Sequence, residues 1–141
     1  MSQWLPRTQV PGQEVRVTRT TTPLLPASAG LLEFNGLGRL GHFIAITADA
    51  PAWVSFYSSA AARQADGSRP ITTDPMPGRG VLLDLVTTTP VETVAAGPGC
   101  TYFSSEVTTA TPQPPLRALV RNTGTSPAAI ALTVTAVVLV P

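Results

Sequence analysis

The chain has 141 residues, of which 12% are charged, and nine arginines against eight acidic residues give a formal net charge of +1. This length suits one domain that buries roughly two thirds of the surface of its unfolded chain. Because the charged fraction is far below the usual value of about 25% and the arginines are scattered, we expect no nucleic-acid partner.

The mean hydropathy of +0.21 is high for so few charges, so we expect part of the apolar surface to contact other subunits. Trp4, Pro6 and Arg7 interrupt any signal-peptide core, and the apolar segment 128–140 is too short to cross a bilayer. We therefore expect neither export nor a membrane partner. The single cysteine, Cys100, lies in an apolar run and is interpreted as a small buried hydrophobe.

Residues 1–30 differ in composition from the rest of the chain and predict an extended N-terminal arm with one strand. Val15 and Val17 alternate with polar residues over 14–22, and prolines at 23 and 26 then end the strand pattern. Such an arm can add a strand to a neighbouring subunit. An equally weighted alternative is a frayed terminus followed by the domain's own edge strand. The predicted partner-binding residues are Trp4, Leu5, Val15, Val17, Leu24 and Leu25.

The next two predicted strands cover residues 31–34 and 39–47, separated by the strong turn signal Asn35-Gly36. Strict alternation in the second strand would place Leu40, Ile44 and Ile46 on the same face as His42.

The central stretch 52–89 contains two apolar strands, 53–57 and 81–86, which we expect at the heart of the core. The connection between them is predicted to be an ordered loop. Ser58 or Ser59 can cap a single helical turn over 60–65, and Asp66-Gly67 supplies a tight turn.

Further strands are expected at 91–94, 100–103, 116–122 and 130–140, with a proline- and threonine-rich crossover at 108–115. No amphipathic helix is visible. The pattern predicts an all-β protein: a single antiparallel, jelly-roll-like β-sandwich of seven or eight strands over residues 31–141, preceded by the arm over 1–30.

The central stretch also carries the pattern W-V-x-x-Y-x-x-A-A-A-R-x-A-D-x-S-R followed by T-D-P-x-P-G-x-G-V-L, from Trp53 to Arg69 and from Thr73 to Leu82. Together with the Arg-Asn-Thr-Gly-Thr turn and the Thr/Val strand after it, this stretch resembles a group of small virion proteins of tailed bacteriophages, frequent among cyanophages. The resemblance covers roughly residues 45–141.

This resemblance implies a non-enzymatic structural component of a virion, assembled in the host cytoplasm. The favoured position is the tail, as a baseplate or short tail-fibre subunit, and the alternative is a capsid-decorating or cement protein. Its expected partners are other virion proteins and further copies of itself, with a trimer favoured.

The sequence contains no motif that predicts a catalytic residue, a cofactor or a metal site. His42 is the single histidine, which excludes most triads and metal sites, and its apolar neighbours favour a structural role. Asp66, Asp74 and Asp84 could in principle meet near the central loop as a glycosidase pair or a calcium site. Ordinary turn-capping roles are the preferred interpretation for the first two.

A host-surface glycan is a further alternative partner. Trp53, Tyr57, Tyr102 and Phe103 could stack on sugar rings, although their positions in strands favour burial in the core.

Overall fold

The computed structural model describes residues 12–141, which form nine strands and one short helix. The strands are β1 (Gln13–Thr20), β2 (Ala29–Phe34), β3 (Leu40–Ala48), β4 (Ala52–Tyr57), β5 (Val81–Thr87), β6 (Glu92–Ala95), β7 (Thr101–Phe103), β8 (Leu116–Asn122) and β9 (Ala131–Val140). Helix α1 spans Ala60–Asp66 and follows β4. No helix in residues 12–141 is long and apolar enough to cross a membrane.

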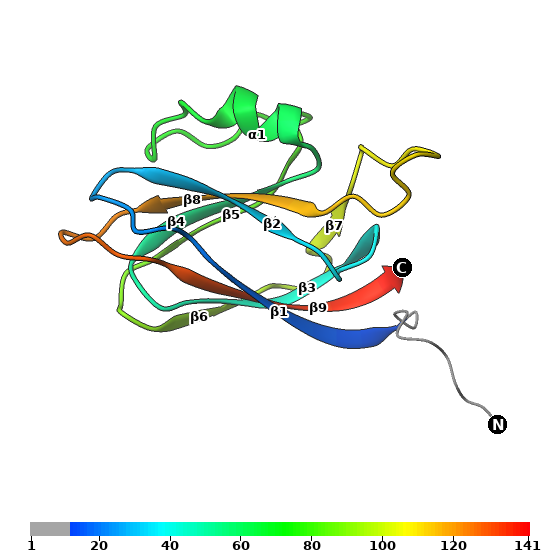
Figure 1. Ribbon diagram of the computed structural model, residues 1–141, viewed down its shortest axis with the longest axis horizontal. Helices are drawn as coiled ribbons and strands as arrows, with labels where there is room; N and C mark the ends of the chain where they lie inside the picture. The colour runs from blue at the N-terminus through cyan, green and yellow to red at the C-terminus, as the bar shows by residue number, and fades with distance from the viewer. Residues whose placement is uncertain (1–11) are drawn as a thin grey trace.

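The strands form two antiparallel sheets that pack face to face (Figure 1). One sheet has the order β1-β9-β3-β6, with β7 also paired to β3, and the other has the order β2-β8-β4-β5. β6 and β7 pair with successive parts of β3, so together they fill one strand position. β1 pairs with β9, β2 with β8, β3 with β6 and β7, and β4 with β5. This nested order of antiparallel pairs, distributed over two sheets, is the arrangement of a jelly roll. The predicted antiparallel, jelly-roll-like β-sandwich is confirmed.

Alternation along the strands accounts for the core. In β9, Leu132, Val134, Ala136 and Val138 are fully buried between the sheets. Val54 and Phe56 of β4 oppose them from the second sheet, and tilted aromatic pairs link Phe56 to Phe34 and Phe43. A period of two therefore places the large aliphatic and aromatic side chains at the sheet-to-sheet contact.

The N-terminal strand belongs to the sandwich. β1 pairs with β9 from Gln13 to Thr20, and Val15 and Val17 pack against the core. Of the two alternatives for this region, the structure therefore has the domain's own edge strand. The domain boundary drawn at residue 31 moves to residue 13, because β1 completes the first sheet and β2 already begins at Ala29. Residues 1–11 lie outside the described part of the chain.

A β-bulge in β3 makes one prediction wrong, namely that Ile44 and Ile46 share a face. Phe43 pairs with Ala136 and Ala45 with Thr135, which leaves Ile44 as an extra residue. Phe43 and Ile46 are buried, whereas Ile44 is 40% exposed, so Ile44 does not share a face with Ile46 as strict alternation predicted. The extra residue shifts the side-chain phase by one position.

Candidate functional site

A third layer covers the outer face of the β2-β8-β4-β5 sheet. It consists of α1 and the loop that joins β4 to β5 (Figure 1). All six residues of β4 are buried, because Val54 and Phe56 face the core while Trp53, Ser55 and Tyr57 lie under this layer. We call α1 and the loop, residues 58–80, the cap.

The cap begins as the sequence predicted. Ser59 is the N-cap of α1, and its hydroxyl accepts a hydrogen bond of 3.0 Å from the amide of Ala62. Three alanines in a row allow the helix to lie close to the sheet, and Arg63 then reaches inward with only 8% of its surface exposed. A helix this short depends on such tertiary contacts for its stability.

One set of ion pairs fastens α1 to the sheet. Nη1 of Arg63 donates to Glu33 Oε2 at 2.6 Å and to the carbonyls of Leu32 and Ala118. Glu33 also pairs with Arg117, whose Nε donates to Glu106 at 3.0 Å. Strands β2 and β8 and the helix are thus joined through alternating charges.

A second set holds the loop after α1 and is centred on Arg69. Its guanidinium donates to both oxygens of Asp66 and to Asp84 on β5. Asp84 Oδ1 accepts from Nε1 of Trp53 at 2.7 Å, and Asp66 Oδ2 accepts from the hydroxyl of Tyr57 at 2.6 Å. Tyr57 therefore bonds directly to the cap, and Trp53 is linked to it through Asp84 and Arg69.

Glycine is required where the cap returns to the sheet. Gly80 has φ +82°, and a β-carbon there would lie 2.7 Å from the β-carbon of Ala62 and 2.8 Å from Ser58 Oγ. The carbonyl of Gly80 accepts from the amide of Ser58 at 2.9 Å, which closes the two ends of the cap on each other. No L-side chain fits this conformation and this contact together.

Burial raises the pKa of Asp66, but hydrogen bonds from Arg69 and Tyr57 outweigh burial, so the pKa lies below its ordinary value. Burial and the hydrogen bond to Asp66 both raise the pKa of Tyr57. The hydrogen bond to Asp66 raises the pKa of Arg69 as well. Asp66 is therefore the ionised partner of both groups at neutral pH.

We expect the contribution of Asp66 to stability to disappear in acid. A lowered pKa in the folded state stabilises the fold above the unfolded value of about 3.9, and this stabilisation is lost as the pH falls through the folded pKa. The difference in free energy of unfolding between the native chain and Asp66→Asn should be largest at neutral pH and shrink below about pH 4. Denaturant titrations at a series of pH values measure it, and a difference that does not change with pH contradicts the assigned role.

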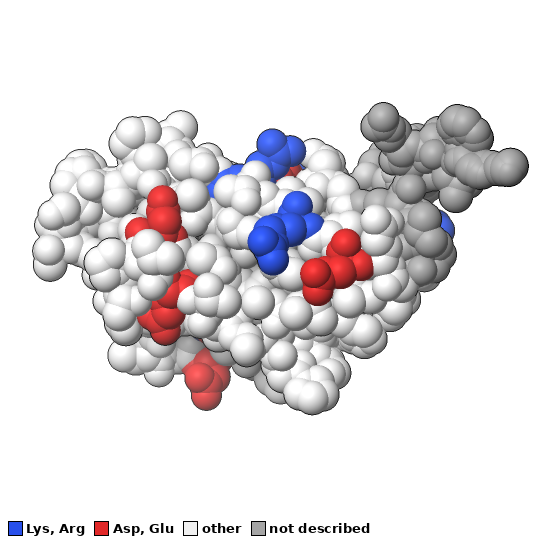
Figure 2. All heavy atoms as spheres, turned by 90° about the horizontal axis from the view of Figure 1, so that it is seen from below, with Lys and Arg blue, Asp and Glu red and all other residues white. Residues whose placement is uncertain are grey.

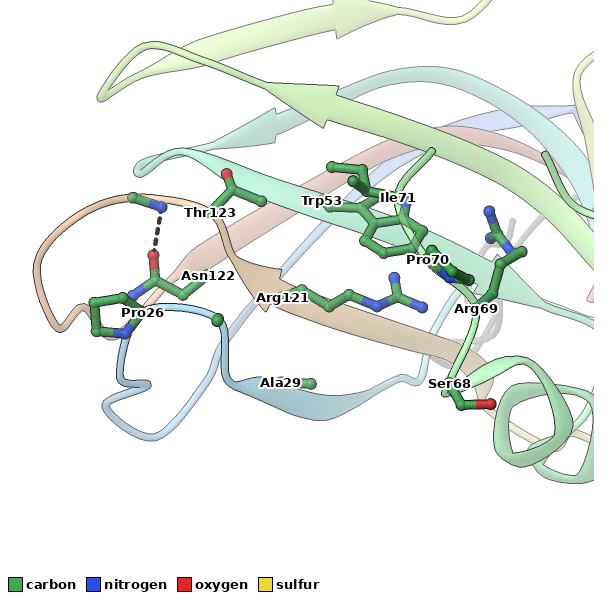
Figure 3. A pocket seen from close by; sticks show the side chains of 13 residues that line it. Pro26, Ala29, Trp53, Ser68, Arg69, Pro70, Ile71, Arg121, Asn122 and Thr123 are labelled. Atoms are coloured by element: carbon green, nitrogen blue, oxygen red, sulfur yellow. Dashed lines mark hydrogen bonds between the residues drawn. The ribbon is translucent and has the colours of Figure 1, made fainter. Parts of the chain in front are cut away.

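A hollow lies at the edge of the cap, beside the second set of contacts (Figure 3). Its volume is about 470 Å³, and it is bounded by the start of β2, the end of β8 with the turn after it, and residues 67–71 of the cap. Arg121 of β8 runs beneath the indole of Trp53, with its guanidinium carbon 3.5 Å from the ring centroid. Pro26, Ala29, Pro70 and Ile71 supply apolar walls.

The predicted partner-binding residues differ in their burial. Leu24 is buried in the core at 6% exposure, and Val15 and Val17 pack against the core, so these three are engaged within their own chain. Leu25 is 65% exposed and remains available to a partner. Trp4 and Leu5 lie outside the described residues.

Three of the four aromatic residues weighed as a sugar platform are buried. Trp53, Tyr57 and Tyr102 are at most 5% exposed, whereas Phe103 is 44% exposed. Burial in the structure is therefore the correct interpretation for these three rings. Cys100 was predicted to be a small buried hydrophobe; it packs against the core but is only half-buried.

The structure brings two of the three candidate aspartates together. Asp66 and Asp84 share Arg69, which forms an ion pair with each of them, while Asp74 is exposed on the loop. Residues 12–141 contain no group of three or more histidine, cysteine or acidic side chains that could hold a metal ion.

Sequence reasoning missed the role of Arg121. The alternation of apolar residues in β8 placed Arg121 on the face opposite the core. That face of a strand is normally exposed to solvent. An available signal was β4, where Trp53 and Tyr57 alternate with core residues, because a strand with large apolar groups on both faces is covered on both.

No protein-family model, curated protein or solved structure matched this chain.

Proposed function

We propose that this protein is a non-enzymatic structural subunit of a bacteriophage virion, with the tail as its favoured position, at the baseplate or in a short fibre. The observation that carries the proposal is the use of the phage-like pattern in the fold. Trp53, Tyr57, Arg63, Asp66 and Arg69 all turn inward and hold the cap on the sheet. The residues of the pattern thus serve to hold a rigid scaffold together, which fits a structural component of a particle.

The jelly-roll arrangement is compatible with this role, since virus capsid proteins use it, but lectins and cupins use it too. A fold alone therefore does not decide among these functions. The burial of Trp53, Tyr57 and Tyr102 removes the aromatic platform on which the glycan-binding alternative depended.

The uncapped sheet offers a surface for assembly. Figure 2 views the molecule from this side and shows few, scattered charged side chains on a mainly uncharged surface. Hydroxyls there pair with each other across strands, Thr18 with Thr133 and Thr47 with Thr93, each at 2.8 Å. β1 ends the sheet order at one edge, which gives neighbouring chains a strand edge as well as a weakly charged face.

The proposal predicts that the protein remains on purified particles. We expect gold-labelled antibodies against it to decorate intact virions at regular positions, on the tail for a baseplate or fibre subunit and on the head for a decoration protein. A purified chain that stays monomeric, together with virions that carry no label, would show that the proposed role is wrong.

The N-terminal residues can be tested in the same system. Because β1 pairs along its length with β9, the informative truncation removes residues 1–11 and leaves the sandwich intact. We expect this variant to keep the unfolding free energy of the full chain but to assemble less well, measured by sedimentation and by incorporation into particles. Unchanged incorporation would exclude a role for these residues in assembly.

A further inference from the structure

Arg121 is a buried cation that forms no direct ion pair with the described residues, although its charge helps to lower the pKa of Asp66. It is 8% exposed, as Arg63 is, yet Arg63 pairs with Glu33 whereas no carboxylate in residues 12–141 lies within 4.0 Å of Arg121. The nearby Asp66 and Asp84 both pair with Arg69 instead.

The hydrogen bonds of Arg121 are also incomplete. Nη1 donates to Ser55 Oγ at 3.2 Å, but the buried Nη2 has no acceptor. The indole of Trp53 covers one face of the guanidinium, which stabilises the positive charge but leaves the donors at the edge of its plane unused. Buried polar groups are nearly always hydrogen-bonded, so an unpaired guanidinium nitrogen calls for an acceptor.

The side chain with this unused donor lines the hollow of about 470 Å³ at the edge of the cap. Figure 3 shows Arg121 extending along this hollow between Trp53 and Ala29. The volume falls within the range of about 300–1,000 Å³ that is typical of small-molecule sites. The lining combines apolar walls with a few polar groups, which is the usual composition of such sites.

From these observations we infer that the hollow binds a small ligand that presents a single carboxylate to Arg121. A guanidinium matches the planar geometry of a carboxylate and can donate two parallel hydrogen bonds to it.

Among anions, the local charges favour a monoanion over a dianion. Arg69 and Arg121 balance Asp66 and Asp84, so a carboxylate brings the group to one net negative charge, and a dianionic phosphate would meet stronger repulsion from the two aspartates. The body of the ligand rests against Pro26, Pro70 and Ile71, which favours a compact, partly apolar group next to the carboxylate. Because Nη2 is buried, binding requires a shift of the side chains that cover it. This site is separate from the assembly role, because it lies on the capped sheet.

The indole N–H signal of Trp53 in a ¹H–¹⁵N correlation spectrum of the full chain reports on this site. The probes are N-acetylvaline and glucuronate, which carry the same carboxylate on a peptide-like and on a sugar body, with N-acetylvalinamide, glucuronamide and inorganic phosphate as comparisons. We expect a saturable shift from at least one carboxylate at concentrations up to about 10 mM, and at least about tenfold weaker binding of its amide. The more strongly bound acid identifies the body that the walls prefer.

Two variants separate the site from general effects on the fold. Ala29→Phe fills the hollow from an exposed strand position without changing Arg121, and Ala95→Phe makes the same change at an exposed position on β6 of the other sheet. Ala29→Phe should abolish the shift, and Ala95→Phe should keep it. The inference is overturned if neither acid produces a saturable shift, if acids and amides bind equally, or if Ala29→Phe binds as the native chain does.

Discussion

Replacing Trp53 with alanine should lower the free energy of unfolding by about 3–5 kcal/mol, the usual cost of removing a large buried ring. The indole is 5% exposed, donates to Asp84, and lies against the guanidinium groups of Arg69 and Arg121. Its loss leaves a cavity under the cap and removes the aromatic face on which Arg121 rests. Equilibrium denaturation in guanidinium chloride measures the change.

Two further variants separate the effect of burying the ring from the effect of its hydrogen bond. Trp53→Phe keeps most of the ring but loses the N–H donor to Asp84, so it should cost about 1–3 kcal/mol and separate the hydrogen bond from the packing. Phe103→Ala truncates a ring that is 44% exposed and should cost less than Trp53→Ala. A change below about 1 kcal/mol for Trp53→Ala would mean that the cap does not bury this ring.

Gly41→Ala is expected to destabilise the fold by about 3 kcal/mol or more, although it adds one methyl group. Gly41 is the second residue of β3, where a β-carbon would overlap the hydroxyl end of Tyr102 and come within 2.5 Å of the carbonyl oxygen of Val137. Tyr102 cannot move away cheaply, because it is 1% exposed and its hydroxyl donates to the carbonyl of Leu37 at 2.6 Å. Burial also raises the pKa of Tyr102 to about 12, so this donor keeps its proton at neutral pH.

Gly97→Ala is the matched control. A β-carbon at Gly97 has no atom within 4 Å, and the backbone there is not left-handed. This variant should change the free energy of unfolding by no more than about 0.5 kcal/mol. Equal effects from the two glycine variants would show that the tight packing of Gly41 against Tyr102 is not what limits substitution.

Local patterns in the sequence were sufficient to predict the strands. Each of the nine has a counterpart in the alternation of apolar residues or in the turn signals beside it, and Ser59 was one of two predicted caps for α1. These features depend on residues close together in the chain, so they can be read without knowledge of the fold. The same holds for β9, where the period of two alone separates the fully buried residues Leu132, Val134, Ala136 and Val138 from their neighbours.

Contacts between distant residues could not be predicted in this way. The pairing of Arg69 with Asp84 and of Arg63 with Glu33 depends on where the cap folds over the sheet, which no local period encodes. The bulge at Ile44 shifted a face because the register of β3 is set by its partner β9. Arg121 stands where alternation predicts solvent, and only the position of the cap makes it a buried group.

The place of β9 in the first sheet has a consequence for how the chain acquires its shape during synthesis. β9 comes last in chain order among the nine strands of residues 12–141, yet it lies between β1 and β3 and pairs with both. Until it emerges, β1 has no hydrogen-bonded partner and the first sheet lacks a central strand. The nascent polypeptide must therefore keep its earlier segments soluble until residues 131–140 have been made, and a chain that stops before residue 131 would lack the strand that joins β1 to β3.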